Sequence, residues 1–129
     1  MENFDWVSAR DACSVTQMFE RLRLAVDEDV KVRQALRKKV DDFGFEQGFE
    51  FTTRGSSFSV SRRGIERGRA VVFAIQGRSI TVKDESGNLL RLASVTINDD
   101  KECVLVVGEE QLQEWQFRKK SLEAIFFGD

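Results

Sequence analysis

The 129-residue sequence contains no histidine, no tyrosine and no proline. Without histidine the chain cannot build Ser-His or Cys-His nucleophile pairs, histidine-ligated zinc or the commonest general base at neutral pH. Its nine glycines never form GxGxxG or GxxxxGK[ST], so no nucleotide-binding fingerprint is present. These absences favour a non-enzymatic protein, and we predict no catalytic residue, no cofactor and no metal site.

Cysteine is also scarce, because only Cys13 and Cys103 are present, without a CxxC motif. This usage favours two free thiols over a disulfide. The first six residues carry acids where a signal peptide needs Lys or Arg, and the longest apolar run, 70–75, is far shorter than the roughly 20 residues of a membrane span. We therefore expect a cytoplasmic protein with neither a signal peptide nor a membrane span.

The length and composition predict one globular domain over residues 1–129. Apolar residues make up 41% of the chain and charged residues 33%, without any low-complexity segment. This balance is typical of a folded soluble domain, and the length is close to that of an average domain.

The N-terminal third has the period of a helix. From Val15 to Phe43 the apolar residues recur at about 100° per residue, and Gly44 suits the position after a helix end. Ser8 and Ser14 are two possible N-caps. One rod over 14–43 would be about 45 Å long, more than the roughly 36 Å width of the globule. The segment therefore forms one overhanging helix or a helix pair, with a possible second start at residues 27–29.

After Gly44 the hydrophobic period becomes two, and Gly- and Asn-containing turns fall between the apolar segments. Such short connections join neighbouring antiparallel strands and leave no room for crossover helices. We predict a six-stranded antiparallel meander with strands near 45–54, 57–63, 69–76, 79–84, 89–98 and 102–107.

A second helical pattern follows Gly108, with Glu109 and Glu110 in its first turn. Its apolar face is formed by Leu112, Trp115, Leu122, Ile125 and Phe126. The fold class is therefore α+β, with this helix packed on the sheet and Trp115 as its anchor. The last predicted strand, 103–107, is apolar throughout, which an edge strand normally avoids. Barrel closure, the C-terminal helix or a second copy could cover it, and the long N-terminal helix favours a homodimer.

An antiparallel meander followed by a C-terminal helix with Trp115 resembles the pleckstrin-homology arrangement. That resemblance covers about half of the chain and implies that basic residues near the early strands could bind anionic phosphoinositide head groups. The sequence departs from the arrangement in having six readable strands instead of seven and a long helical segment first. No motif is specific enough to transfer individual residues.

Charge is unevenly distributed. Residues 51–83 hold seven basic residues and one acidic residue, a net charge of +6, within a chain whose net charge is −2. Guanidinium groups bind oxyanions bidentately, so this segment suits an acidic protein, a nucleic acid or an anionic head group. Alternatively, its charges are solvated or lie beside the acidic helices of the same molecule. The candidate contact residues are Arg62, Arg63, Arg67 and Arg69.

Phenylalanine supplies 11 aromatic residues, with two tryptophans beside them. These residues either fill the core or line a dry cavity that selects a lipid-like ligand by its shape. The candidates for this cavity or core are Phe45, Phe49, Phe51, Phe58, Phe73 and Trp115. We therefore interpret the protein as a non-enzymatic binding module with a basic hairpin, and as an alternative a small apolar-ligand binder.

Overall fold

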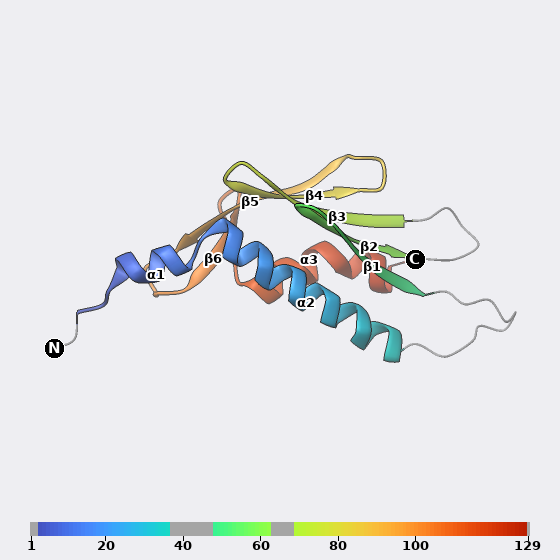
Figure 1. Cartoon of the computed structure of the whole chain (residues 1–129), viewed down its shortest axis with the longest axis horizontal. Coiled ribbons are helices and arrows are strands. Elements are labelled where there is room, and N and C mark those ends of the chain that lie inside the picture. The colour runs from blue at the N-terminus through green and yellow to red at the C-terminus, as the bar shows by residue number, and fades with distance from the viewer. Residues whose placement is uncertain (1–2, 37–47, 63–68, 129) are drawn as a thin grey trace, which may run out of the picture.

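The structure, a computed structural model, describes residues 3–36, 48–62 and 69–128. An N-terminal helix pair is followed by an antiparallel meander sheet and a C-terminal helix (Figure 1). This order confirms the predicted α+β class. The sheet has seven strands rather than the predicted six.

The helix pair consists of α1, Trp6–Ala12, and α2, Val15–Leu36. Asp5 caps α1 by accepting a hydrogen bond from the backbone N–H of Ser8 at 3.0 Å. Ser14 begins α2, because its hydroxyl accepts from the backbone N–H of Gln17 at 3.1 Å. The chain thus divides at residues 13–14, and α2 runs without a break through 27–29. The predicted helix end at Gly44 lies outside the described residues.

Each strand pairs with its neighbour in sequence, so the strand order in the sheet is that of the chain. Gly55 and Gly77 have φ values of 58° and 63° in the tight turns after the first and third strands. Glycine adopts this left-handed conformation without steric cost, which explains these turn positions. The strands are β1 Phe49–Arg54, β2 Ser57–Arg62, β3 Arg69–Gln76, β4 Ser79–Asp84, β5 Leu89–Ile97, β6 Cys103–Val107 and β7 Glu110–Leu112.

The additional strand, β7, pairs with β6, with Leu112 opposite Leu105. The apolar β6 is therefore an inner strand, and the prediction that it forms an edge is wrong. Residues 109–110 resemble a helix start in sequence, and three residues are too few to reveal a strand period. Strand β7 itself covers the edge of β6, so neither barrel closure, nor the C-terminal helix, nor a second copy is needed there. The edge strand therefore no longer supports the prediction of a homodimer.

The core lies between the sheet and the two long helices, α2 and α3, Glu114–Phe127, which lie side by side across one face (Figure 1). Phe58 on β2 and Phe73 on β3 stack with ring centroids 4.7 Å apart. Phe19 of α2 lies 4.9 Å from Phe58, and Phe117 of α3 lies 6.3 Å from Phe73. One continuous aromatic row thus joins both helices to the sheet.

Helix α3 packs on the sheet through Phe117, which is completely buried, whereas Trp115 is 52% exposed. The prediction that Trp115 anchors the helix is therefore wrong. The cause is Leu112, which belongs to β7 but was counted in the helical stripe and shifted its phase. Ser121, Leu122, Ile125 and Phe126 complete the buried face.

Cys13 and Cys103 form a disulfide, with their Cα atoms 5.5 Å apart. The prediction of two free thiols is wrong, because the fold brings the junction of α1 and α2 to the beginning of β6. No local spacing rule reveals a pairing between residues 90 positions apart. The bond closes a covalent loop that contains α2 and the first five strands.

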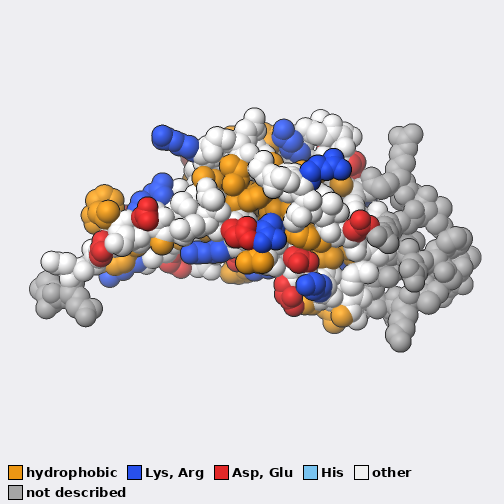
Figure 2. Space-filling model, viewed as in Figure 1, with side chains coloured by type: hydrophobic (Ala, Val, Ile, Leu, Met, Phe, Trp, Pro, Cys, Tyr) orange, Lys and Arg blue, Asp and Glu red, His pale blue; other side chains and the backbone are white. Residues whose placement is uncertain are grey.

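Figure 2 shows both signs of charge mixed along the exposed face of α2. The helix carries the i,i+3 and i,i+4 ion pairs Glu20–Arg23 and Asp27–Lys31 on that face. Among the described residues, no helix combines the length and apolar character needed to cross a membrane.

We predict that Phe117→Ala lowers the free energy of unfolding by about 3 to 5 kcal/mol, because it empties a buried ring position in the core. Trp115→Ala is expected to cost less than about 1 kcal/mol, because half of that side chain already contacts solvent. Urea denaturation of both variants measures the difference. An equal loss in the two would contradict the helix phase described above.

We also predict that opening the disulfide destabilises the protein by about 3 to 5 kcal/mol, because the loop-closure entropy of so long a loop is returned to the unfolded chain. Denaturation with and without a thiol reductant measures this loss. The double variant Cys13→Ser/Cys103→Ser serves as the control, since its stability must not respond to the reductant. If the free energy of unfolding of the wild type also did not change with the reductant, that result would contradict the disulfide.

Candidate functional site

An apolar groove runs between α2 and α3, with a volume of about 410 Å³. We call it the interhelical groove. Its α2 wall includes Val32 and Leu36, which are 48% and 74% exposed. Its α3 wall includes Trp115 and Phe127, which are 52% and 67% exposed. Monomeric proteins rarely leave four large apolar side chains exposed beside one another, so this groove is a candidate binding surface.

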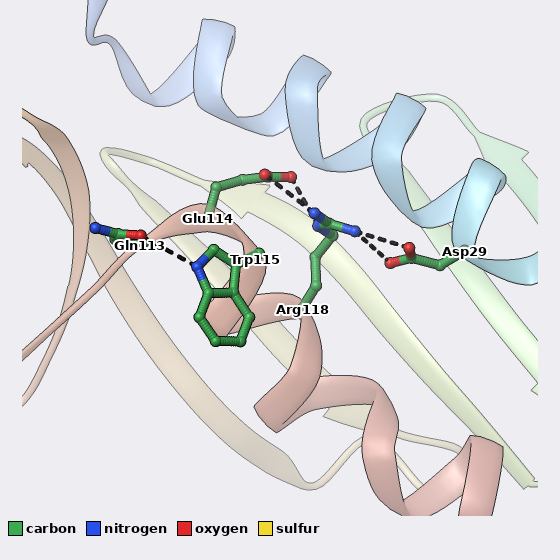
Figure 3. Close-up of polar contacts among 5 residues, drawn as sticks. All are labelled: Asp29, Gln113, Glu114, Trp115 and Arg118. Carbon is green, nitrogen blue, oxygen red and sulfur yellow. Dashed lines mark hydrogen bonds and ion pairs between the residues drawn. The ribbon is translucent and has the colours of Figure 1, made fainter.

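Trp115 is held in place at the start of the groove. Its indole Nε1 donates a hydrogen bond to Gln113 Oε1 at 3.1 Å (Figure 3). The Gln113 backbone N–H in turn donates to Gln116 Oε1 at 2.8 Å, which orders the first turn of α3. An immobilised, half-exposed tryptophan loses little conformational entropy when it contacts a ligand.

An arginine clamp joins the two walls of the groove (Figure 3). Arg118 of α3 donates two hydrogen bonds to Asp29 of α2, at 2.7 and 2.8 Å. Its Nε also lies 2.8 Å from Glu114 Oε1, an ion pair without the alignment of a hydrogen bond. Partial burial acts to lower the pKa of Arg118, but its hydrogen bonds to Asp29 and the charge of Glu114 outweigh burial and raise that pKa. The guanidinium therefore stays charged and fixes the distance between the helices.

Two other arginines stabilise the C-terminal end of α3. Arg33 Nε donates to the carbonyl oxygen of Phe126 at 2.9 Å, and Arg62 donates to that of Gly128 at 3.3 Å. Cations at this end also offset the negative end of the helix dipole. The Arg33 guanidinium lies 4.6 Å from the ring centroid of Phe127, which holds that exposed ring against the groove.

The meander separates the basic residues that the sequence groups together. Arg62 and Arg69 are direct partners in the β2–β3 register, so they lie at the same end of the sheet. Arg54, the last residue of β1, and Arg78, in the turn between β3 and β4, lie at the opposite end. Arg63 and Arg67 lie outside the described residues. The basic segment is therefore divided between two surfaces, because successive hairpins reverse the chain direction.

A second hollow, of about 340 Å³, lies between the other side of α3 and the ends of β3, β4 and β5. We call it the Ser121 pocket. Arg69 lines it together with Arg91, Lys120 and Ser121, three residues that sequence reasoning missed. Asp84 and Glu85 also line it. These six residues come from three separate parts of the chain, so no sequence motif could have identified the pocket.

Both carboxylates of the pocket are occupied within the protein. Asp84 Oδ1 accepts from the backbone N–H groups of Ser86 and Asn88, each at 2.9 Å. The backbone hydrogen bond from Asn88 is the largest effect lowering the pKa of Asp84. Glu85 Oε1 accepts from the backbone N–H of Ala70 at 3.3 Å. Their acceptor oxygens thus shape the loop between β4 and β5 and tie it to β3.

The predicted aromatic cluster is core rather than cavity at the positions that the structure describes. Phe49, Phe58 and Phe73 are buried and contact other aromatic rings. Phe51 is partly buried against the same core, and Phe45 lies outside the described residues. Trp115 is the exception, because it lines the interhelical groove.

In the part of the chain that the structure describes, no three acidic or cysteine side chains are grouped to hold a metal ion. The two hollows instead offer different binding chemistry. The interhelical groove presents apolar side chains with a fixed indole, and the Ser121 pocket presents three cations and two carboxylates.

No protein-family model, curated protein or solved structure matches this chain. The seven strands equal the number in the pleckstrin-homology arrangement, but the helix pair still comes first and Trp115 lies in the first turn of α3. The conclusions about function therefore rest on the residues of the chain itself.

Proposed function

We propose that this protein is a non-enzymatic interaction module that binds an acidic partner through the basic end of β2 and β3. The observation that carries the proposal is the pairing of Arg62 with Arg69 in the antiparallel register. Like charges directly opposite each other in a sheet are destabilising, so this arrangement costs stability unless an anionic group lies between or beside them.

The two arginines have different surroundings. Arg62 is half-buried and donates to the end of α3, so part of its role is structural. Arg69 is exposed, and among the described residues no carboxylate lies within ion-pair distance of it. Lys120 and Arg91 line the same pocket as Arg69, which gives three cations against the two carboxylates of Asp84 and Glu85. An acidic partner would therefore meet local positive charge despite the net charge of −2.

We predict that the wild type binds heparin, used as a model polyanion, at about 50 mM salt and that affinity falls at least about tenfold by 200 mM. Arg63→Ser/Arg67→Ser/Arg69→Ser should reduce this binding at least about tenfold, because it removes three positive charges. The variant keeps Arg62 and its hydrogen bond to the Gly128 carbonyl oxygen at the end of α3. Binding is measured by fluorescence anisotropy of labelled heparin, and stability by urea denaturation.

The matched control is Arg21→Ser/Arg54→Ser/Arg78→Ser, which makes the same charge change at exposed positions away from this end of the sheet. It should retain most of the binding. Equal losses in the two triple variants would show that net charge alone is responsible. That result, or no heparin binding by the wild type, would overturn the proposal.

The interhelical groove supports a second candidate function, the binding of a small apolar ligand. It is lined by the exposed apolar side chains of Val32, Leu36, Trp115 and Phe127, and its volume falls within the usual range of small-molecule sites. Trp115 reports on occupancy, because its indole lies in the groove wall.

We predict that dodecanoate, used as an apolar probe, shifts Trp115 emission to shorter wavelength in a Trp6→Phe background. Burying the indole removes water from around it, which is the cause of the shift. Leu36→Glu should abolish the response, and Leu89→Glu, an exposed leucine of β5 outside the groove, should preserve it. No response in the background protein would remove this candidate.

Cytoplasmic location and self-association stay predictions. The disulfide removes the two free thiols that supported a cytoplasmic location. The pairing of β6 with β7 removes the exposed edge strand that supported a homodimer. Alkylation of free thiols in intact cells tests the compartment, since disulfides persist mainly in oxidising ones. Light scattering tests the mass against the 14.8 kDa of one chain.

A further inference from the structure

Arg33 carries a positive charge of the interhelical groove that has no carboxylate partner among the described residues. Three cations and two carboxylates line the groove, which leaves a net charge of +1. Both carboxylates are paired inside it, because Asp29 binds Arg118 and Glu123 binds Lys119 at 3.1 Å. No carboxylate of the described residues lies within ion-pair distance of Arg33. The uncompensated charge of the groove is therefore located at Arg33.

The contacts of Arg33 hold its side chain and leave one side of the guanidinium free. Its Nε donates to the carbonyl oxygen of Phe126 at 2.9 Å. Its guanidinium carbon lies 5.4 Å from the ring centroid of Phe49 and 4.6 Å from that of Phe127. The two terminal nitrogens make no hydrogen bond with the described residues, and both retain contact with solvent. A carboxylate can therefore bind both of them at once, and the held side chain loses little further entropy.

The rest of the groove extends away from this cation along α3. Phe127 lies beside Arg33, and the helix runs from there back to Trp115 over about 18 Å, at 1.5 Å per residue. Val32 and Trp115 are half exposed along this length, and the buried Leu122 lies between the two helices. An acyl chain laid along the groove would remove water from these apolar side chains.

The shape and charge of the groove favour one class of occupant, an amphiphile with a single anionic head. A neutral apolar ligand would cover the groove and leave Arg33 without a counter-ion. A helix of a partner protein is about 10 Å across, and the groove volume of about 410 Å³ equals only about one turn of such a helix. A narrow acyl chain with a carboxylate head matches both the volume and the charge.

We propose that the interhelical groove binds a fatty acid, with its carboxylate on the terminal nitrogens of Arg33 and its acyl chain directed along α3 toward Trp115. This inference rests on the second candidate function, the binding of an apolar ligand. It adds the class of ligand, the residue that binds its head and the direction of its chain.

Fluorescence titration of Trp115 in the Trp6→Phe background tests the head group with probes of equal chain length. Dodecanoate should bind at least about tenfold more tightly than dodecanol, the usual effect of a hydrogen bond between charged groups. Dodecyltrimethylammonium should bind more weakly than dodecanol, because its head has the same sign of charge as Arg33.

Variants of the two groove cations locate the preference for a carboxylate. Arg33→Gln should lower the affinity for dodecanoate to that for dodecanol, whereas Arg33→Lys keeps the charge and should keep most of the preference. Lys119→Gln is the matched control, because it makes the same charge change in the same groove at a cation already paired with Glu123. It should also keep most of the preference. Urea denaturation and dodecanol binding report whether each variant retains its fold and its groove.

The direction of the acyl chain is tested on the background protein alone, so this test does not depend on the folding of any Arg33 variant. Bromine quenches indole fluorescence on contact. A dodecanoate brominated at the far end of its chain should quench Trp115 more strongly than one brominated next to the carboxylate. The reverse order would overturn the proposed direction.

Equal affinity of the background protein for dodecanoate and dodecanol would overturn the carboxylate site. An equal loss of the preference in Arg33→Gln and Lys119→Gln would overturn it as well. In either case, continued binding of dodecanol leaves the apolar-ligand candidate standing. No response to any of the three probes would remove both that candidate and this inference.

Discussion

The stacked rings of Phe58 and Phe73 hold together the layers of this fold. They lie on the neighbouring strands β2 and β3, and each extends the contact to one long helix, through Phe19 of α2 and Phe117 of α3. An antiparallel sheet with one apolar face requires such a cover, because that face would otherwise contact water. The row of rings determines where both helices lie on the sheet, and therefore where the hollows beside them form.

Helix α3 is a wall of both candidate sites. Its buried stripe contacts the sheet, which leaves one flank facing α2 and the other facing the ends of β3 to β5. The α2 flank has the exposed Trp115 and the Arg118 clamp, so it is apolar with fixed charges. The opposite flank has Lys120 beside Arg69 and Arg91, so its charge is mainly positive. One helix thus separates two surfaces of different chemistry.

The sequence predicted the strands well because two independent signals agreed, the period of two and the turn residues between segments. The predicted boundaries of 69–76 and 79–84 coincide with β3 and β4. Periodicity was weaker where an element was short or contained a misleading residue. Leu112 belongs to the three-residue β7, and counting it as helical gave Trp115 the place of Phe117. The Ser121 pocket could not be predicted, because long-range packing alone brings Arg69, Arg91 and Ser121 together.

The disulfide divides the molecule into two mechanical parts. A backbone cut at any one position between Cys13 and Cys103 would leave the two fragments covalently joined, whereas α3 lies outside this ring. Release of α3 from the sheet is therefore opposed only by its own packing and polar contacts, without help from loop closure. Native-state hydrogen exchange should then report a lower opening free energy for α3 than for β2 and β3. Because α3 lines both hollows, each of them would be lost whenever this helix detaches from the sheet.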